Sequence, residues 1–357
     1  MSSNNLSKAA LLMVVLVVAA IASWELYLRS KGVAINYDDG APLWADKRAM
    51  VYEPADRSTV FIGSSRIKFD LDFDTWKEVT GDQAVMLAIQ GSSPVPLLHD
   101  LADDKNFKGK LVIDVTEPLF FGHAPPMFVQ PKEYIDYYNN RTPAQRASFA
   151  INHFLESRLV FLDEEYLSLN AQLGALNVKS RPGVYIFPPP PGFPMDFDRN
   201  TFDRRSRMTD KFVADTNQHK QVTAVWAFLM PPPPKPGDPR PSQESVDSSI
   251  NGVIQAVKIS TDKIKARGGQ IIFVRTPSSG QMGMGEKMGF PRERYWNKLL
   301  EVTGTAGIHF ADYPSIDHFI CPEWSHLAPG DANIFTRELA KILTEKGWKF
   351  PKLSGTK

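Results

Sequence analysis

Five short apolar runs constrain the fold of this 357-residue chain more than any other feature of the sequence. The runs are rich in β-branched residues, and four of them lead into a segment that contains glycine, serine or threonine. Continuous apolar runs of this kind are typical of strands that are buried on both faces of a parallel sheet. The predicted strands are residues 59–63, 84–89, 111–115, 270–274 and 308–310.

Helical patterns lie between these strands. Apolar residues recur on one face over residues 250–264, before Gly268, and again over residues 334–343, before Gly347. Glycine after an apolar stripe is a common helix end. Alternating strands and helices predict an α/β fold, in which helices cover both faces of a doubly wound parallel sheet. Such folds bind ligands at the carboxyl ends of their strands.

The N-terminus carries an apolar stretch over residues 9–28, in which Glu25 is the only charged residue. About 20 apolar residues are enough to cross the hydrocarbon core of a bilayer. Trp24 and Tyr27 belong to the residue types that favour the membrane–water interface. The stretch therefore predicts a single-pass anchor over residues 1–29, in the inner (cytoplasmic) membrane.

A cleaved signal peptide is the alternative, because Ala20-Ile21-Ala22 matches the small-residue pattern of a cleavage site. With either interpretation the rest of the chain is exported to the periplasmic, extracytoplasmic side. We expect a juxtamembrane linker over residues 30–57 and an α/β domain over residues 58–350, interrupted by an insert over residues 121–249.

The insert combines a helical part with two proline-rich tracts. The pattern predicts helix over residues 143–175, and the prolines cluster in residues 187–194 and 231–236. Proline runs favour extended chain without internal hydrogen bonds. The tracts are interpreted either as a lid or partner-docking loop, or as stiff surface loops without a partner.

Composition excludes several classes of function. The net charge of +1 gives no basic face for nucleic acid. Cys321 is the single cysteine, which excludes an intramolecular disulfide and any site built on paired cysteines. The histidines have no metal-ligand spacing, and no glycine-rich phosphate loop occurs. We therefore expect no metal and no cofactor.

Two short segments carry the residue types of serine-dependent catalysis. Ser65 follows the first predicted strand within Gly63-Ser64-Ser65-Arg66, where a hydroxyl projects from the sheet edge and the first amides of a helix are open to an oxyanion. Glu323 precedes His326 by three residues, a spacing that lets the carboxylate reach the imidazole. Since a serine nucleophile needs a base and the base an orienting acid, we predict these roles for Ser65, His326 and Glu323.

The order and setting of these segments resemble the SGNH (GDSL-like) hydrolases. Ser64 and Ser65 stand where that family has the aspartate and the nucleophile of its Gly-Asp-Ser block. Glu323 and His326 match its C-terminal Asp-x-x-His block, with glutamate in place of aspartate. The resemblance covers about residues 57–346 without the insert, and it implies a flavodoxin-like, three-layer SGNH fold.

The resemblance also implies an oxyanion hole. Gly91 resembles the family glycine whose backbone N–H binds the oxyanion, together with the N–H of Ser65. The family's Gly-x-Asn-Asp block is replaced by Asp114-Val115-Thr116-Glu117-Pro118, so its asparagine donor is missing and Thr116 is the partial substitute. Loss of one such donor typically slows catalysis by ~10²–10³-fold.

A similar loss of the middle blocks is seen in membrane-anchored branches of the superfamily. These branches include the DltD-like proteins and the alginate O-acetylation proteins, which work beside a membrane-bound O-acyltransferase. The resemblance implies serine-dependent transfer of an acyl group, preferably acetyl, to a cell-envelope or exported polysaccharide. The alternatives are a periplasmic carbohydrate or lipid esterase, and a non-catalytic scaffold that binds glycan or a membrane O-acyltransferase.

Three further residues are candidates for substrate binding. Arg66 and Arg275 have the planar cations that bind a carboxylate or phosphate through two hydrogen bonds, although structural ion pairing is the alternative. Ser278 follows the fourth predicted strand and lies at the expected active edge, where it either lines an acceptor site or belongs to an ordinary loop.

Overall fold

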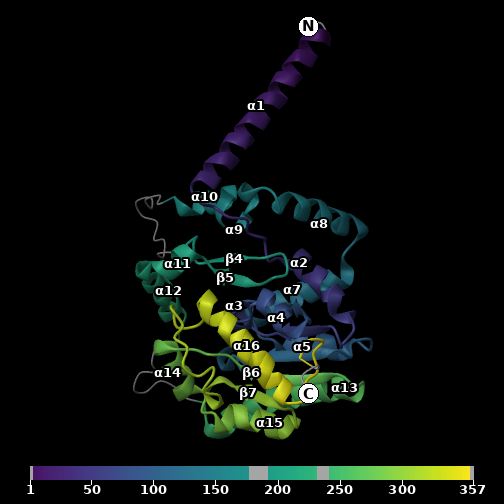
Figure 1. The fold of residues 1–357 in the computed structure, drawn as a ribbon, viewed down its shortest axis with the longest axis vertical. Helices are drawn as coiled ribbons and strands as arrows, with labels where there is room; N and C mark the ends of the chain where they lie inside the picture. Colours follow the sequence, from purple (N-terminus) through teal and green to yellow (C-terminus); the bar gives the residue numbers. More distant parts are fainter. Residues whose placement is uncertain (1–2, 177–191, 231–240, 354–357) are drawn as a thin grey trace. The chain divides into compact units, whose positions relative to one another are not determined.

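A five-stranded parallel sheet forms the centre of the larger of two compact units, which consists of residues 39–141 and 188–357 (Figure 1). The computed structural model describes residues 3–176, 192–230 and 241–353. All five predicted strands are confirmed, and their order in the sheet is β2-β1-β3-β6-β7. The strands are β1 (Ser58–Ile62), β2 (Gln83–Met86), β3 (Lys110–Asp114), β6 (Gln270–Arg275) and β7 (Gly307–His309).

Side chains alternate between two cores because successive residues of a strand point to opposite faces. In β1, Val60 and Ile62 pack into one core and Phe61 packs into the other. The first core is covered by α2 (Ala41–Ala49), α5 (Val95–Asp103), α7 (Pro126–Asn140), α13 (Gln243–Ala266) and α15 (Lys298–Thr303). The second is covered by α3 (Ser65–Asp70), α4 (Phe73–Thr80) and α16 (Pro329–Glu345).

The remaining elements of this unit are short. They include β4 (Asp198–Asn200) and its antiparallel partner β5 (Ser206–Met208), α11 (Asp210–Ala214) and α12 (Thr216–Leu229). A third, smaller apolar cluster joins Phe69 of α3 to Phe197 and to side chains of β5, α11 and α12. The connections hold η1 (Met50–Tyr52), α6 (Glu117–Phe120), α14 (Gly280–Gly289), the π-helical η3 (Glu293–Asn297) and η4 (Phe310–Asp312).

The smaller unit consists of residues 1–38 and 142–187. Its first helix, α1 (Ser3–Ser30), is long and apolar enough over Asn5–Ser30 to cross a membrane. The other elements are α8 (Pro143–Glu156), η2 (Val160–Leu162), α9 (Glu164–Leu167) and α10 (Leu169–Ala175).

The predicted linker and the predicted helical part of the insert each contain more separate elements in the structure than the sequence pattern indicates. The expected linker over residues 30–57 contains α2, whose Trp44 is fully buried in the first core. The helical pattern over residues 143–175 is broken into α8, η2, α9 and α10, because the chain turns on either side of η2. The proline tracts lie almost entirely outside the described residues.

Candidate active site

The three predicted catalytic residues are hydrogen-bonded in series. Ser65 Oγ lies 2.8 Å from His326 Nε2, and His326 Nδ1 lies 2.9 Å from Glu323 Oε1. A carboxylate only accepts hydrogen bonds, so Nδ1 carries the proton and Nε2 is left to accept from the hydroxyl. The folded chain thus brings together a serine, a base and an orienting acid, the arrangement of a catalytic triad.

The site lies where the strand order of the sheet reverses. From β1 the chain crosses to β2 on one side and then returns to β3 on the other side of β1. In doubly wound sheets the crevice at such a switch point, outside the carboxyl ends of the strands, is the usual ligand site. Ser65 follows β1 and Thr116 follows β3, so both lie at this edge.

Gly63 explains how the end of β1 lies so close to β3. A Cβ atom at this position would be 2.5 Å from Asp114 Cβ and 2.9 Å from Ile67 Cγ2. Ser64 is the N-cap residue of α3, but its side chain makes no capping bond and contacts Asp114 and Thr116 instead. Ser65 is the first residue of α3, and its side chain is half-buried.

The loop that carries His326 contains a strained backbone. Trp324 has a positive φ of 79°, which costs a non-glycine residue about 1–3 kcal/mol. The loop is held in place by Ser279 N–H, which donates to Trp324 O at 2.9 Å, and by Leu327 N–H, which donates to Asp70 Oδ1 at 2.9 Å. The Trp324 ring fills the space beside Gly280, where a Cβ would approach it to 2.3 Å.

Side chains from other elements enclose the imidazole. Phe69 stacks on the His326 ring with centroids 4.2 Å apart. Glu323 is fully buried and accepts from the backbone and ring N–H groups of His326 and, at 2.5 Å, from the indole N–H of Trp226. Trp226 lies on α12, so the insert contributes directly to the site, which the sequence did not indicate.

Asp114 lies beside the serine turn in a buried network of hydroxyl groups. Its Oδ2 accepts from Thr116 at 3.1 Å and from Ser64 at 3.3 Å, and its Oδ1 accepts from Thr276 at 3.1 Å. Burial raises the pKa of Asp114 above its usual value. Thr116, predicted as an oxyanion donor, also lies 2.8 Å from Ser64 Oγ, so its hydroxyl is already engaged by these partners.

Gly91 lies in the loop beyond β2, alongside the serine turn. The β1–β2 ladder continues past the strands, since Leu87 N–H donates to Phe61 O and Ile89 N–H donates to Gly63 O at 3.2 Å. These bonds bring Ile89, two residues before Gly91, against Gly63 at the start of the serine turn. The φ of Gly91 is +63°, a conformation that favours glycine.

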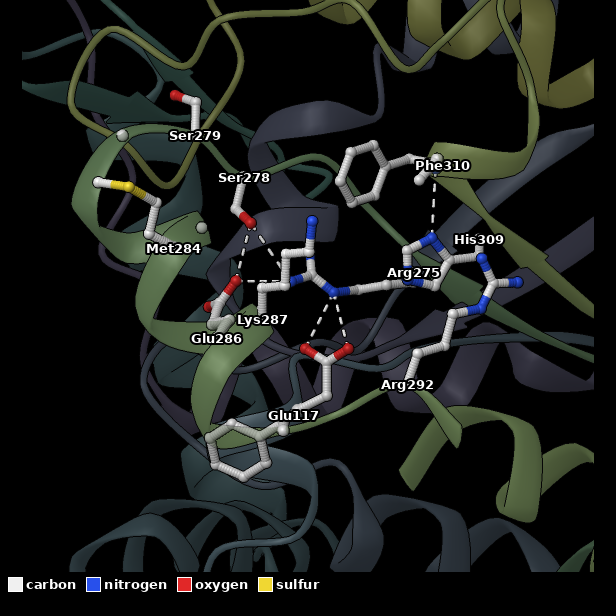
Figure 2. A pocket seen from close by; sticks show the side chains of 14 residues that line it. Glu117, Arg275, Ser278, Ser279, Met284, Glu286, Lys287, Arg292, His309 and Phe310 are labelled. Carbon is white, nitrogen blue, oxygen red and sulfur yellow. Dashed lines mark hydrogen bonds and ion pairs between the residues drawn. The ribbon is translucent and has the colours of Figure 1, made fainter. Parts of the chain in front are cut away.

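The three candidate binding residues belong to a buried ion-pair network. Arg66 pairs with Glu286 and donates to Ser325 Oγ at 3.3 Å. Arg275 pairs with Glu117 at 2.9 Å and with the same Glu286 at 2.5 Å. Figure 2 shows Arg275 between the two glutamates, with Ser278 donating to Glu286 at 2.7 Å.

Arg275 and Ser278 also line a cavity of about 520 Å³. Its wall includes cationic and aromatic side chains. Burial, and then the charges of Arg275 and Arg292, lower the pKa of His309 to about 3. Among the described residues Ser65 and His326 lie outside this cavity, and no group of three His, Cys, Asp or Glu residues is arranged to hold a metal. The charged and aromatic lining is Glu117, Arg275, Glu286, Lys287, Phe290, Arg292, His309 and Phe310 (Figure 2).

Comparison of the sequence with protein-family models gives no match, and a search of curated proteins gives no significant match.

Proposed function

We propose that this protein transfers an acyl group, preferably acetyl, through a covalent acyl-Ser65 intermediate. The observation that carries the proposal is the series of hydrogen bonds from Ser65 through His326 to Glu323. A half-buried hydroxyl next to an accepting imidazole is poised to lose its proton as it attacks.

In the first step Ser65 Oγ attacks the carbonyl carbon of an acyl ester and its proton moves to His326 Nε2. The imidazolium that forms is stabilised by Glu323, which already accepts from Nδ1. Collapse of the tetrahedral intermediate breaks the bond to the donor alkoxide, which takes the proton from His326. The product of this step is the acyl-Ser65 ester and the free donor alcohol.

In the second step a hydroxyl of the acceptor attacks the acyl-Ser65 ester, and His326 takes the acceptor's proton. Collapse of the second intermediate forms the new ester and returns the proton to Ser65. Water in place of the acceptor gives an esterase.

The negative oxygen of both intermediates requires donors. The N–H groups of Ser65 and Gly91 are the proposed pair of donors. The side chain of Ser64 makes no capping bond at the start of α3, which supports the use of the first helical N–H group as an oxyanion donor. Thr116 is a weaker third donor, since its hydroxyl bonds Asp114 and Ser64. A two-donor hole suits slow modification of a polymer better than rapid hydrolysis.

The SGNH, flavodoxin-like character of the domain is part of this proposal. Counted along the sheet, the strand order is the 2-1-3-4-5 order of flavodoxin-like folds. Nucleophile and base occupy the first and last of the blocks that resemble the family.

The cavity beside Arg275 is the proposed site for part of a polysaccharide acceptor. Its volume of about 520 Å³ lies within the ~300–1,000 Å³ range of small-molecule sites. Phe310 offers an apolar face and Lys287 a cation for an acidic sugar, whereas Arg292 is already paired with Asp312 at 2.6 Å. The cavity is coupled to the serine turn because Glu286 pairs with both Arg275 and Arg66, the residue after Ser65.

The apolar α1 supports the location that we propose. As an uncleaved anchor it would hold the catalytic unit at the extracytoplasmic face of the inner membrane. A membrane-bound O-acyltransferase that supplies the acyl group is the proposed partner, because a single helix offers no path for an activated donor across the bilayer.

Labelling with a fluorophosphonate probe tests the catalytic proposal. We expect stoichiometric labelling of the wild-type protein, none of Ser65→Ala, and wild-type labelling of Ser245→Ala, a control on the exposed side of α13. Absence of wild-type labelling in a folded protein would favour the scaffold alternative and reject the enzyme.

The acceptor is tested in cells that carry wild-type or Ser65→Ala protein. We expect the O-acetyl content of an envelope or exported polysaccharide to fall in the Ser65→Ala strain, with equal amounts of protein in both membranes. Equal polymer acetylation, combined with probe labelling of Ser65, would instead indicate an esterase.

A further inference from the structure

The smaller unit exposes an apolar surface on helices other than α1. On α8 the exposed side chains include Ile151 (61%) and Phe154 (56%), with Leu155 beside them. On and directly after α10 they are Leu169 (73%) and Leu176 (59%), with Leu173 between them. Exposed apolar clusters of this kind usually mark a protein or membrane contact.

The exposed side of α8 is its apolar side. At about 100° per residue, Ala144, Ala147, Ile151, Phe154 and Leu155 fall within one stripe of the helix. No residue of α8 is buried, although the helix has a clear apolar face. A soluble amphipathic helix turns its apolar stripe toward the core, so α8 has the opposite arrangement.

The other side of α8 faces the rest of the smaller unit. His153 lies against Tyr37 with ring centroids 5.8 Å apart, and Phe149 stacks on His153. These two α8 side chains are half-buried, and they lie on the side of the helix away from Ile151. The packing therefore fixes which stripe of α8 points outward.

Residues near the end of α1 mark a membrane–water boundary. Trp24 and Tyr27 are exposed and stack with ring centroids 5.6 Å apart. Lys31 lies 5.5 Å from the Tyr27 ring. Aromatic rings followed by a cation are typical of the level at which a transmembrane helix leaves the hydrocarbon core.

The chain that follows α8 is bound at this same level. The Glu25 carboxylate accepts from the backbone N–H groups of Val160 at 3.1 Å and Phe161 at 3.2 Å. Arg29 donates to Arg158 O at 2.7 Å. The C-terminal end of α8 is thus tied to α1 at the level of its interfacial aromatic residues, and Figure 1 shows α8 extending from this end of α1.

We propose that the exposed apolar surface of α8 and α10 lies in the headgroup region of a phospholipid bilayer, as a second membrane contact beside α1. The exposed apolar surface of α8 and α10 continues from the apolar α1, so we infer that lipid covers it. Arg158, which stacks on Phe154 with its guanidinium 3.8 Å from the ring centroid, would reach phosphate while the ring enters the acyl boundary. The proposal rests on α1 as a membrane span and is independent of the chemistry at Ser65.

Fluorescent labels at single cysteines test this contact in the full-length protein. The background is Cys321→Ala, which removes the only cysteine, and a thermal unfolding curve checks that each variant is folded. Labels are placed at Ile151→Cys and Leu173→Cys, with Asn152→Cys as the control, because Asn152 is exposed but turned about 100° away from Ile151. The protein is reconstituted in vesicles of phosphatidylethanolamine and phosphatidylglycerol that contain brominated lipid.

We expect brominated lipid to quench the labels at residues 151 and 173 at least about twofold more strongly than the label at residue 152. Equal quenching at the three positions would overturn the proposal. Labels at 151 and 173 that are shielded from an aqueous quencher but not quenched by lipid would also overturn it, since a protein partner or second copy would then cover the surface. Probe labelling of Ser65 is measured separately, so failure of either proposal is recognised by itself.

Discussion

Among the buried glutamates near the carboxyl ends of the strands, Glu286 and Glu323 have partners that differ in kind. Glu286 is paired with two permanent cations, Arg66 and Arg275, and these hold its pKa down at about 2 against the effect of burial. Within the part of the chain that the structure describes, Glu323 accepts from the N–H groups of His326 and the indole of Trp226, none of which carries a permanent charge. Glu286 is compensated at all times, whereas Glu323 gains a cationic partner only when His326 takes a proton.

Under the proposed mechanism, this difference separates a structural carboxylate from one that takes part in the chemistry. A buried carboxylate that lacks a full counter-charge stabilises the imidazolium as it forms, which is the state that a serine attack requires. A carboxylate already neutralised by arginines has nothing further to offer a reaction, but its removal leaves buried cations unpaired.

Replacing Glu323 with glutamine should abolish most of the chemistry without unfolding the protein. The amide keeps the shape of the side chain but removes the negative charge that orients and stabilises His326, so we expect fluorophosphonate labelling to slow by ~10³–10⁴-fold. The rate of labelling and the midpoint of thermal unfolding are measured on the same preparation. A labelling rate within about tenfold of wild type would contradict the role of Glu323.

Replacing Glu286 with glutamine should mainly affect stability. It leaves two buried guanidinium groups with one fewer carboxylate, so we expect the free energy of unfolding to fall by about 3–5 kcal/mol. Denaturant unfolding measures the change. Glu78→Gln is the matched control, because Glu78 pairs with Arg337 on the exposed surface and its loss should change stability little.

Acid pH provides a second test of the Glu286 network. The folded pKa of Glu286 is lowered from 4.5 to about 2, so its contribution to stability is present above pH ~4.5 and is lost as the pH falls toward 2. This shift corresponds to about 3 kcal/mol. Wild-type protein should lose that amount relative to Glu286→Gln over this range, and parallel stability curves for the two proteins would count against the ion-pair assignment.

Replacing Trp226 with phenylalanine should give a moderate loss of activity. The variant keeps an aromatic ring near His326 but removes the indole N–H that donates to Glu323. A hydrogen bond to a charged group contributes about 1.5–3 kcal/mol, so we expect labelling to slow by roughly 10- to 100-fold. Trp348→Phe, in the second core, is the control, and equal labelling rates for both variants would deny Trp226 a part in the site.

The sequence predicted the sheet and the triad because both depend on short-range patterns. Apolar runs identify buried strands, and residues at strand ends meet at one edge of a parallel sheet, so Ser65 and His326 could be paired although they are 261 positions apart. Trp226 could not be found in this way. It comes from the insert, where neither strand pattern nor motif fixes which side chain turns toward Glu323.

The two arginines illustrate a second limit of sequence. Arg66 and Arg275 were candidates for anion binding or for structural ion pairs, and only the fold shows that both meet Glu286. Glu286 is 220 positions from Arg66 and lies in a glycine-rich segment that gave no signal of its own. Which charges neutralise each other is a property of packing between distant elements.

The smallest expected effect belongs to Asp70, which supports the His326 loop through Leu327 N–H. Burial raises the pKa of Asp70 well above its usual value, and among the described residues its Oδ2 has no hydrogen-bond partner. Because the folded pKa is higher than the unfolded value of about 3.9, the folded state loses stability as the pH rises above ~4, up to the folded pKa.

Asp70→Asn keeps an oxygen for Leu327 N–H and has no charge to bury. Its free energy of unfolding should therefore rise relative to wild type as the pH increases from 4, with fluorophosphonate labelling preserved. A difference between the two proteins that does not change with pH would show that Asp70 is ionised in the fold and that its contact with the loop is a charged one.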